Sequence, residues 1–138
     1  MRDDRGKKAA LREAALDAME HAYAPYSNFR VGAALRTSDG TLVTGCNIEN
    51  SVFGLAICAE TLAVASAVSQ GLTRFEEIAI ATEDVEPTPP CGTCRQVLSE
   101  FAPDITVSSY TRDGKEATWP LAELLPNAFV LNPSRGRI

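Results

Sequence analysis

The chain has 138 residues, of which 45% are hydrophobic and 22% are charged, and its formal net charge at pH 7 is −5. These values are typical of one soluble globular domain that buries its own core, and they exclude a disordered chain. The acidic balance argues against a nucleic-acid partner, and no apolar run is long enough to cross a membrane, so we expect a cytoplasmic protein that binds a small molecule.

Hydrophobic periodicity predicts helices and strands that alternate along the chain. Apolar residues on one face predict a first helix over residues 8–22. Two strand-like runs then flank Ser38-Asp39-Gly40, which is a good hairpin turn. The next helix, residues 58–70, is apolar nearly all round, which predicts that it is buried. The predicted strands are residues 29–37, 41–48, 75–83, 105–111 and 115–119, and the later helices are residues 91–101 and 121–125.

This order of elements predicts a three-layer α/β/α architecture with a mixed five-stranded sheet, because helices cross between the later strands. We expect one domain over residues 1–138, with flexible tails at residues 1–6 and 131–138.

Four cysteines in a compartment that keeps thiols reduced favour metal binding or catalysis over disulfides. Cys91 and Cys94 have the C-x-x-C spacing at a predicted helix start. The pair has three interpretations: a redox pair, half of a closed four-ligand zinc site, or two of three ligands that leave one zinc position for water. A thioredoxin-like redox pair is disfavoured because nothing N-terminal to it resembles the strand–helix–strand arrangement with which that fold opens.

The number of available ligands favours the site with an open position. Cys46 lies in a strand-like run, where a core thiol is expected, although a closed zinc site would need it as fourth ligand. The single histidine, His21, is expected to be an ordinary surface residue at the end of the first helix. The remaining candidates are Cys58, Cys91 and Cys94. All three are predicted at helix N-termini, which stabilise thiolates.

Glu60 follows Cys58 by two residues, a spacing that in mid-helix would turn the two side chains away from each other. In the first turn of a helix both can reach one point. Beside an open zinc position, Glu60 can take a proton from a water whose pKa zinc lowers toward ~7 and pass it to a leaving group. C-x-E followed by P-C-x-x-C matches the zinc deaminases, in which a glutamate that is not a ligand moves the protons.

Five segments between Tyr23 and Phe129 resemble, in order and spacing, the signatures of the small homotetrameric cytidine deaminases: YAPYSNFRVGAAL, GCNIEN, GLAICAE, PCGTCRQVLSEF and ELLPNAF. The resemblance implies a cytidine-deaminase-like fold, with one Zn²⁺ per chain bound by Cys58, Cys91 and Cys94. It implies a hydrolase of pyrimidine salvage that converts cytidine and 2′-deoxycytidine to the uridine products and ammonia. In this family the glutamate, here Glu60, protonates N3 and the leaving amine.

The resemblance also implies the substrate contacts. Phe29 would stack near the pyrimidine ring, and Asn47 and Glu49 would hold the ribose hydroxyls. The Ala59 backbone would read the base edge, and Phe129 would reach into the site of a neighbouring subunit. Taken singly, these residues also fit a core phenylalanine, turn-capping polar groups and an aromatic tail residue packed on its own domain.

Two positions depart from the family pattern. Thr61 stands where three-cysteine members often have an arginine that hydrogen-bonds the thiolates, and Phe53 stands where tyrosine is frequent. Three thiolates give the zinc site a net negative charge, so we expect Arg95 and the two helix starts to offset it.

Two alternatives remain. A blasticidin S deaminase-like enzyme shares C-A-E and P-C-G-x-C-R-Q-V-L but does not carry N-I-E-N. A non-catalytic zinc-binding module would use Cys46 as fourth ligand.

Overall fold

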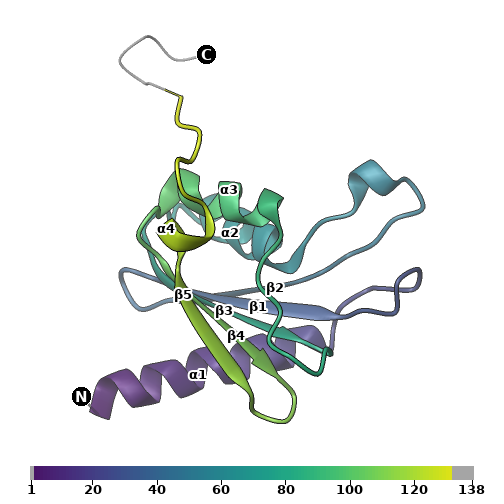
Figure 1. Cartoon of the computed structure of the whole chain (residues 1–138), viewed down its shortest axis with the longest axis horizontal. Coiled ribbons are helices and arrows are strands. Elements are labelled where there is room, and N and C mark those ends of the chain that lie inside the picture. The colour runs from purple at the N-terminus through teal and green to yellow at the C-terminus, as the bar shows by residue number, and fades with distance from the viewer. Residues whose placement is uncertain (1, 132–138) are drawn as a thin grey trace.

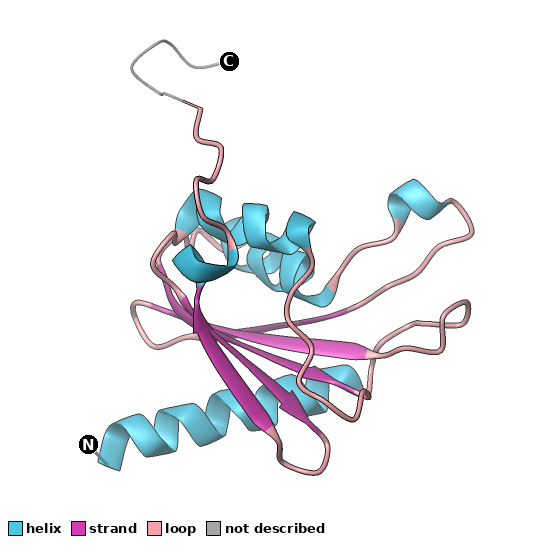
Figure 2. Ribbon diagram, in the orientation of Figure 1, coloured by secondary structure: helices cyan, strands magenta, loops and turns pink. Residues whose placement is uncertain are grey.

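A five-stranded sheet separates one long helix from three shorter ones in the computed structural model, which describes residues 2–131 (Figures 1 and 2). The strands are β1 (Val31–Thr37), β2 (Leu42–Cys46), β3 (Phe75–Thr82), β4 (Thr106–Thr111) and β5 (Glu116–Pro120). The helices are α1 (Arg2–Met19), α2 (Ala59–Ser69), α3 (Gly92–Phe101) and α4 (Leu121–Leu124), with a 3₁₀ turn, η1, at Phe53–Leu55.

The sheet order is β2-β1-β3-β4-β5, with β3 and β4 parallel and the other neighbours antiparallel. Helix α1 covers one face, and α2, α3 and α4 lie on the other (Figure 1). The predicted three-layer α/β/α architecture with a mixed sheet is therefore confirmed.

The alternation of strand side chains divides the core into two clusters. On β1, Ala33 and Leu35 belong to the cluster under α2 and α3, whereas Ala34 belongs to the cluster under α1. Successive strand residues point to opposite faces, so a run of small apolar residues can serve both layers at once.

Two glycines bring a helix very close to each face. A Cβ atom at Gly32 would lie 2.1 Å from the Ala15 carbonyl oxygen of α1, and one at Gly45 would lie 2.4 Å from the Ala59 carbonyl oxygen of α2. Side chains at these positions would therefore hold the helices off the sheet. The contact at Gly45 places the start of α2 directly over β2.

The first helix differs from its predicted bounds. It begins at Arg2 rather than at residue 8, so the helix includes residues 2–6, and the expected flexibility of this segment stays a prediction. Their charged side chains carry no periodic signal, but a helix anchored by a buried apolar face extends at little cost. It ends at Met19, and four residues later Tyr23 donates its backbone N–H to the Asn47 carbonyl oxygen. Of the other predicted tail, residues 131–138, all but Leu131 lie outside the described residues.

Among the described helices, none combines the length and the apolar character needed to span a lipid bilayer.

Candidate active site

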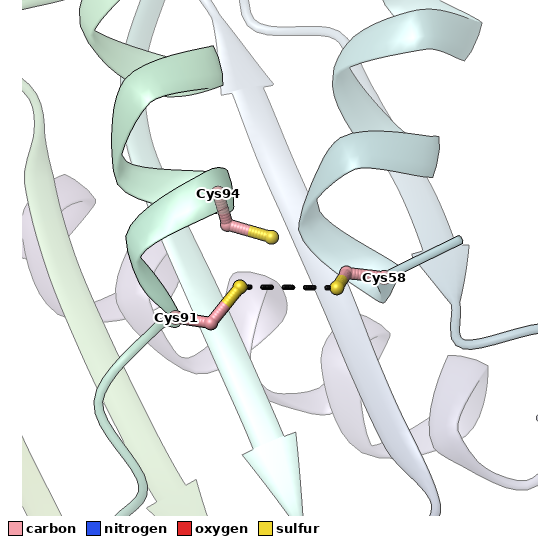
Figure 3. Close-up of side chains that lie close together, drawn as sticks. All are labelled: Cys58, Cys91 and Cys94. Atoms are coloured by element: carbon pink, nitrogen blue, oxygen red, sulfur yellow. Dashed lines mark hydrogen bonds between the residues drawn. The ribbon is translucent and has the colours of Figure 1, made fainter. Parts of the chain in front are cut away.

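The starts of α2 and α3 carry three cysteines whose sulfur atoms converge (Figure 3). Cys58 is the N-cap residue of α2 and Cys91 that of α3, each with extended backbone, and Cys94 lies in the first turn of α3. Neither N-cap side chain hydrogen-bonds to its helix. The thiols are therefore free to face one another, as the positions at two helix starts predict.

The spacing of the sulfur atoms fits a tetrahedral metal. The Sγ atoms of Cys58 and Cys91 are 3.9 Å apart, and all three sulfurs lie within 4.8 Å of one another. Zinc–sulfur bonds of about 2.3 Å in tetrahedral geometry separate the sulfurs by about 3.8 Å. Cys46 is not part of this cluster. Three thiols at this separation form a donor set for zinc with a fourth position left open.

Two of the three thiols have opposite pKa shifts. Hydrogen bonding by Cys94 lowers the pKa of Cys58 to about 6, and Cys91 adds to this effect. The same Cys58–Cys94 hydrogen bond, together with burial, raises the pKa of Cys94. Thiolate character therefore resides first on Cys58, and a divalent cation bound by all three sulfurs would displace the remaining protons.

Glu60 lies two residues after Cys58, in the first turn of α2, and is only 5% exposed. Burial, with a smaller contribution from the negative charge of Cys58, raises the pKa of its carboxyl group to about 7. A carboxyl group with a pKa near neutrality can both accept and release protons under physiological conditions. The two side chains thus reach the same place from one helix start.

A pocket of about 290 Å³ opens in front of the cluster. Cys58, Cys91 and Glu60 line it, so the open side of the donor set faces the pocket. The predicted substrate contacts Phe29, Asn47, Glu49 and Ala59 line it as well. Together with the two cysteines and Glu60, these residues come from four separate segments of the chain, and the fold brings them to one cavity of a size that suits a small molecule.

Comparison with known proteins identifies the family. A model of the cytidine and deoxycytidylate deaminase zinc-binding region matches residues 6–109, most of the chain. The chain belongs to this family. Because the family is zinc-binding and the three cysteines fit that metal, zinc is the cofactor that the site accommodates.

Individual family members are similar over most of their length. A cytidine deaminase from Sporosarcina psychrophila is 45% identical over 115 residues, which cover 81% of this chain and 83% of that protein. The crystal structure of cytidine deaminase from Burkholderia pseudomallei superposes with a TM-score of 0.85 at 47% identity, covering 88% of this chain and 98% of that one. A blasticidin-S deaminase from Bacillus cereus is less similar, at 33% identity over 110 residues, 74% of this chain and 78% of that protein.

Two of the pocket residues also have structural partners. Asn47 accepts a hydrogen bond from the Val31 N–H at 2.8 Å and donates one to the Phe29 carbonyl at 2.8 Å. Glu49 accepts from the Tyr26 and Ser27 N–H groups at 2.9 and 3.1 Å. The turn-capping interpretation of these two residues is therefore correct as far as it goes, and it leaves their roles toward a substrate open.

Thr61 and Arg95, the two residues expected beside the ligand thiols, have different neighbours. The Thr61 hydroxyl is 3.4 Å from the Cys94 sulfur. Arg95 donates to the carbonyl oxygens of Pro90 at 2.8 Å and Leu124 at 2.7 Å. Its guanidinium therefore anchors the loop before Cys91 to the end of α4, and the expectation that Arg95 offsets the thiolate charge stays a prediction.

The remaining predicted residue, Phe129, does not line the pocket and is 71% exposed. Among the lining residues that sequence reasoning missed, two carry a hydroxyl group. Thr82 ends β3, Thr88 lies in the proline-rich loop, and their hydroxyl oxygens are 3.0 Å apart. Neither belongs to a motif, because a threonine at a strand end or in a loop is unremarkable by itself.

Proposed function

We propose that this chain is a zinc-dependent hydrolase that deaminates cytidine and 2′-deoxycytidine, giving uridine or 2′-deoxyuridine and ammonia in pyrimidine salvage. The observation that carries the proposal is the buried Glu60 carboxyl group beside three converging thiols, two of which line the same pocket as Glu60. Asn47 and Glu49, from the N-I-E-N segment, line the same pocket and favour a nucleoside over blasticidin S. The higher identity to cytidine deaminases than to a blasticidin-S deaminase supports the same choice.

Cys58, Cys91 and Cys94 would hold the zinc ion, which when bound supplies a hydroxide nucleophile at neutral pH. Glu60 is the proton carrier of the reaction. Its carboxylate accepts the proton that water loses and delivers it to N3 of the pyrimidine as oxygen adds to C4. It then transfers the hydroxyl proton to the departing amine, so that ammonia leaves and a C4 carbonyl remains. The pKa of about 7 suits both directions of transfer.

The other pocket residues orient the substrate. Phe29 would stack against the base, and the Ala59 backbone would hydrogen-bond to the base edge. Asn47 retains one N–H and one lone pair beyond its contacts with the backbone. These groups and the Glu49 carboxylate are available for the ribose hydroxyls.

We propose a homotetramer as the active assembly. The segment between β2 and α2 projects from the domain as an arm, residues 47–57, with Phe53 83% and Leu55 65% exposed (Figure 2). Phe129 is exposed as well, and large exposed apolar patches mark interaction sites. Phe129 would enter a neighbour's pocket. Sedimentation should give a tetramer, and an active monomer would refute this assembly.

A cytoplasmic location goes with this chemistry, because three ligand thiols must stay reduced to bind zinc. The four cysteines of the chain are all free thiols in the structure.

The function is tested by measuring ammonia release from cytidine, 2′-deoxycytidine, cytosine, cytidine monophosphate and blasticidin S. We expect release from the two nucleosides alone, accompanied by one zinc per chain. Glu60→Gln should retain zinc and lose more than the roughly 10²–10⁴-fold typical of one acid–base group, because it acts at several steps. Release from blasticidin S alone, or a Glu60→Gln variant within tenfold of the parent, would contradict the proposal.

A further inference from the structure

The pocket wall formed by Phe29 and Val31 is held from behind by a residue outside the pocket. Phe29 and Val31 line the cavity, and Arg30 between them does not. Val31 is the first residue of β1, and it pairs with Thr82, the final residue of β3. Arg30 precedes Val31 and Glu83 follows Thr82, so these two residues face each other just beyond the end of the β1–β3 pairing.

The Glu83 side chain continues this ladder. Its Oε1 atom accepts the Arg30 backbone N–H at 2.9 Å, and its Oε2 atom accepts from the Arg30 guanidinium at 2.8 Å. One carboxylate therefore fixes both the backbone and the side chain of Arg30. These hydrogen bonds are charge-assisted, which makes them roughly twice as strong as neutral ones.

Two further charged residues, Arg112 and Glu20, form ion pairs with Glu83 and Arg30. Arg112 donates to Glu83 at 3.3 Å and to Glu20 at 2.6 Å, and Glu20 lies 3.4 Å from a second guanidinium nitrogen of Arg30. The hydrogen bonds from Arg30 hold the pKa of Glu83 at about 2, so this carboxylate is ionised throughout the neutral range. The end of α1, the start of β1, the end of β3 and the β4–β5 turn meet in this network.

The backbone groups of Phe29 and Val31, on either side of Arg30, form hydrogen bonds with side chains other than Glu83. As described above, the Asn47 side chain donates a hydrogen bond to the Phe29 carbonyl oxygen and accepts one from the Val31 N–H. The Ser27 hydroxyl oxygen accepts a hydrogen bond from the Phe29 N–H at 3.1 Å. The Arg30 N–H is the remaining donor of this segment, and Glu83 accepts it. Loss of the Glu83 carboxylate would thus release the segment at its midpoint and leave its two ends attached.

We propose that Glu83 is a positioning residue for nucleoside binding, which holds Phe29 and Val31 against the base through Arg30. This inference rests on the proposed function. A stacking wall contacts the base before and during the reaction, and it is separate from Glu60 and the cysteines. A poorly placed wall therefore weakens ground-state and transition-state binding alike, which raises KM and leaves kcat unchanged.

The test compares Glu83→Gln with Glu86→Gln. Glu86 lies in the same loop and forms an ion pair with Lys115 at 2.7 Å, but it does not line the pocket or touch the segment. In Glu83→Gln, KM for cytidine should rise about fivefold, with kcat and zinc content within twofold of the parent. Calorimetric titration with uridine should show the same fivefold loss. Glu86→Gln should match the parent in every measurement.

A second variant covers the case in which Glu83→Gln does not fold. Arg30→Gln removes the guanidinium and keeps the backbone N–H, so KM should rise at least threefold, again without a change in kcat. An unchanged KM in the folded variants would overturn the inference, as would a loss of kcat and melting temperature at constant KM. If the parent deaminates no cytosine nucleoside, the proposed function fails and the inference fails with it.

Discussion

Replacement of Gly45 by alanine tests whether the close contact between β2 and α2 positions the catalytic groups. The new Cβ atom would lie 2.4 Å from the Ala59 carbonyl oxygen and 2.6 Å from the Ala63 nitrogen. Both contacts are backbone atoms, so no side-chain rotation relieves them and the helix has to move. Restoring ordinary contact requires a shift of roughly 1 Å, a displacement that can cost about 10²-fold in rate when it misplaces a reacting group.

Gly32→Ala is the matched control, because its Cβ atom would lie 2.1 Å from the backbone of α1. Over-packing of this kind costs about 1–3 kcal/mol in either variant. However, α1 carries none of the residues proposed for the site, whereas α2 has Cys58 as its N-cap and Glu60 in its first turn. We therefore expect Gly45→Ala to lose about 100-fold in kcat/KM and part of its zinc, and Gly32→Ala to stay within threefold of the parent.

The assay combines thermal unfolding, zinc content per chain and initial rates of ammonia release at a temperature where both variants are folded. A lowered melting temperature is expected in both. The reasoning would be refuted by a Gly45→Ala variant that is destabilised yet fully active, or by equal activity losses in the two variants.

Three further predictions concern the metal cluster and the charged network. Cys91→Ala should lose zinc and activity while Cys46→Ala keeps both; metal analysis that gives the reverse would exclude the proposed ligand set. Thr61→Val should lower zinc affinity about 10-fold in a chelator competition, because it removes a hydroxyl 3.4 Å from the Cys94 sulfur; unchanged affinity would contradict it. Glu83 stabilises the fold above its ordinary pKa of 4.5, and this contribution is lost as pH falls toward 2. The melting-temperature difference between parent and Glu83→Gln should shrink over that range, and a constant difference would argue otherwise.

Local patterns were sufficient to predict the architecture and the metal cluster. Strand alternation and the crossing helices indicated the layers, and the positions of Cys58 and Cys91 at helix starts placed their sulfurs on one side of the sheet. These features depend on residues a few positions apart, for which periodicity and helix capping are strong signals. The bounds of α1 were less predictable, because a charged helical end has no buried face to mark it.

The contacts that shape the pocket wall had no local signal. Arg30 and Glu83 are separated by 53 residues, and each is an ordinary charged residue in its own segment. Asn47 was predicted as a substrate contact on resemblance alone, and its hydrogen bonds to the backbone became visible only with the fold. Such pairs form because β1 and β3 are neighbours, so the sheet order has to be known before they can be found.

Thr61 and Arg95 have different hydrogen-bond partners near the cysteine cluster. Thr61 belongs to α2 and reaches the Cys94 sulfur of α3, so a neutral hydroxyl links the two helices that carry the ligands. Arg95 donates hydrogen bonds to the Pro90 and Leu124 carbonyls. A single hydroxyl can donate only one hydrogen bond, and it offsets no charge. With zinc bound, the negative charge of three thiolates would be offset by the metal itself and by the N–H groups of the two helix starts, and a contribution from the nearby Arg95 guanidinium stays a prediction.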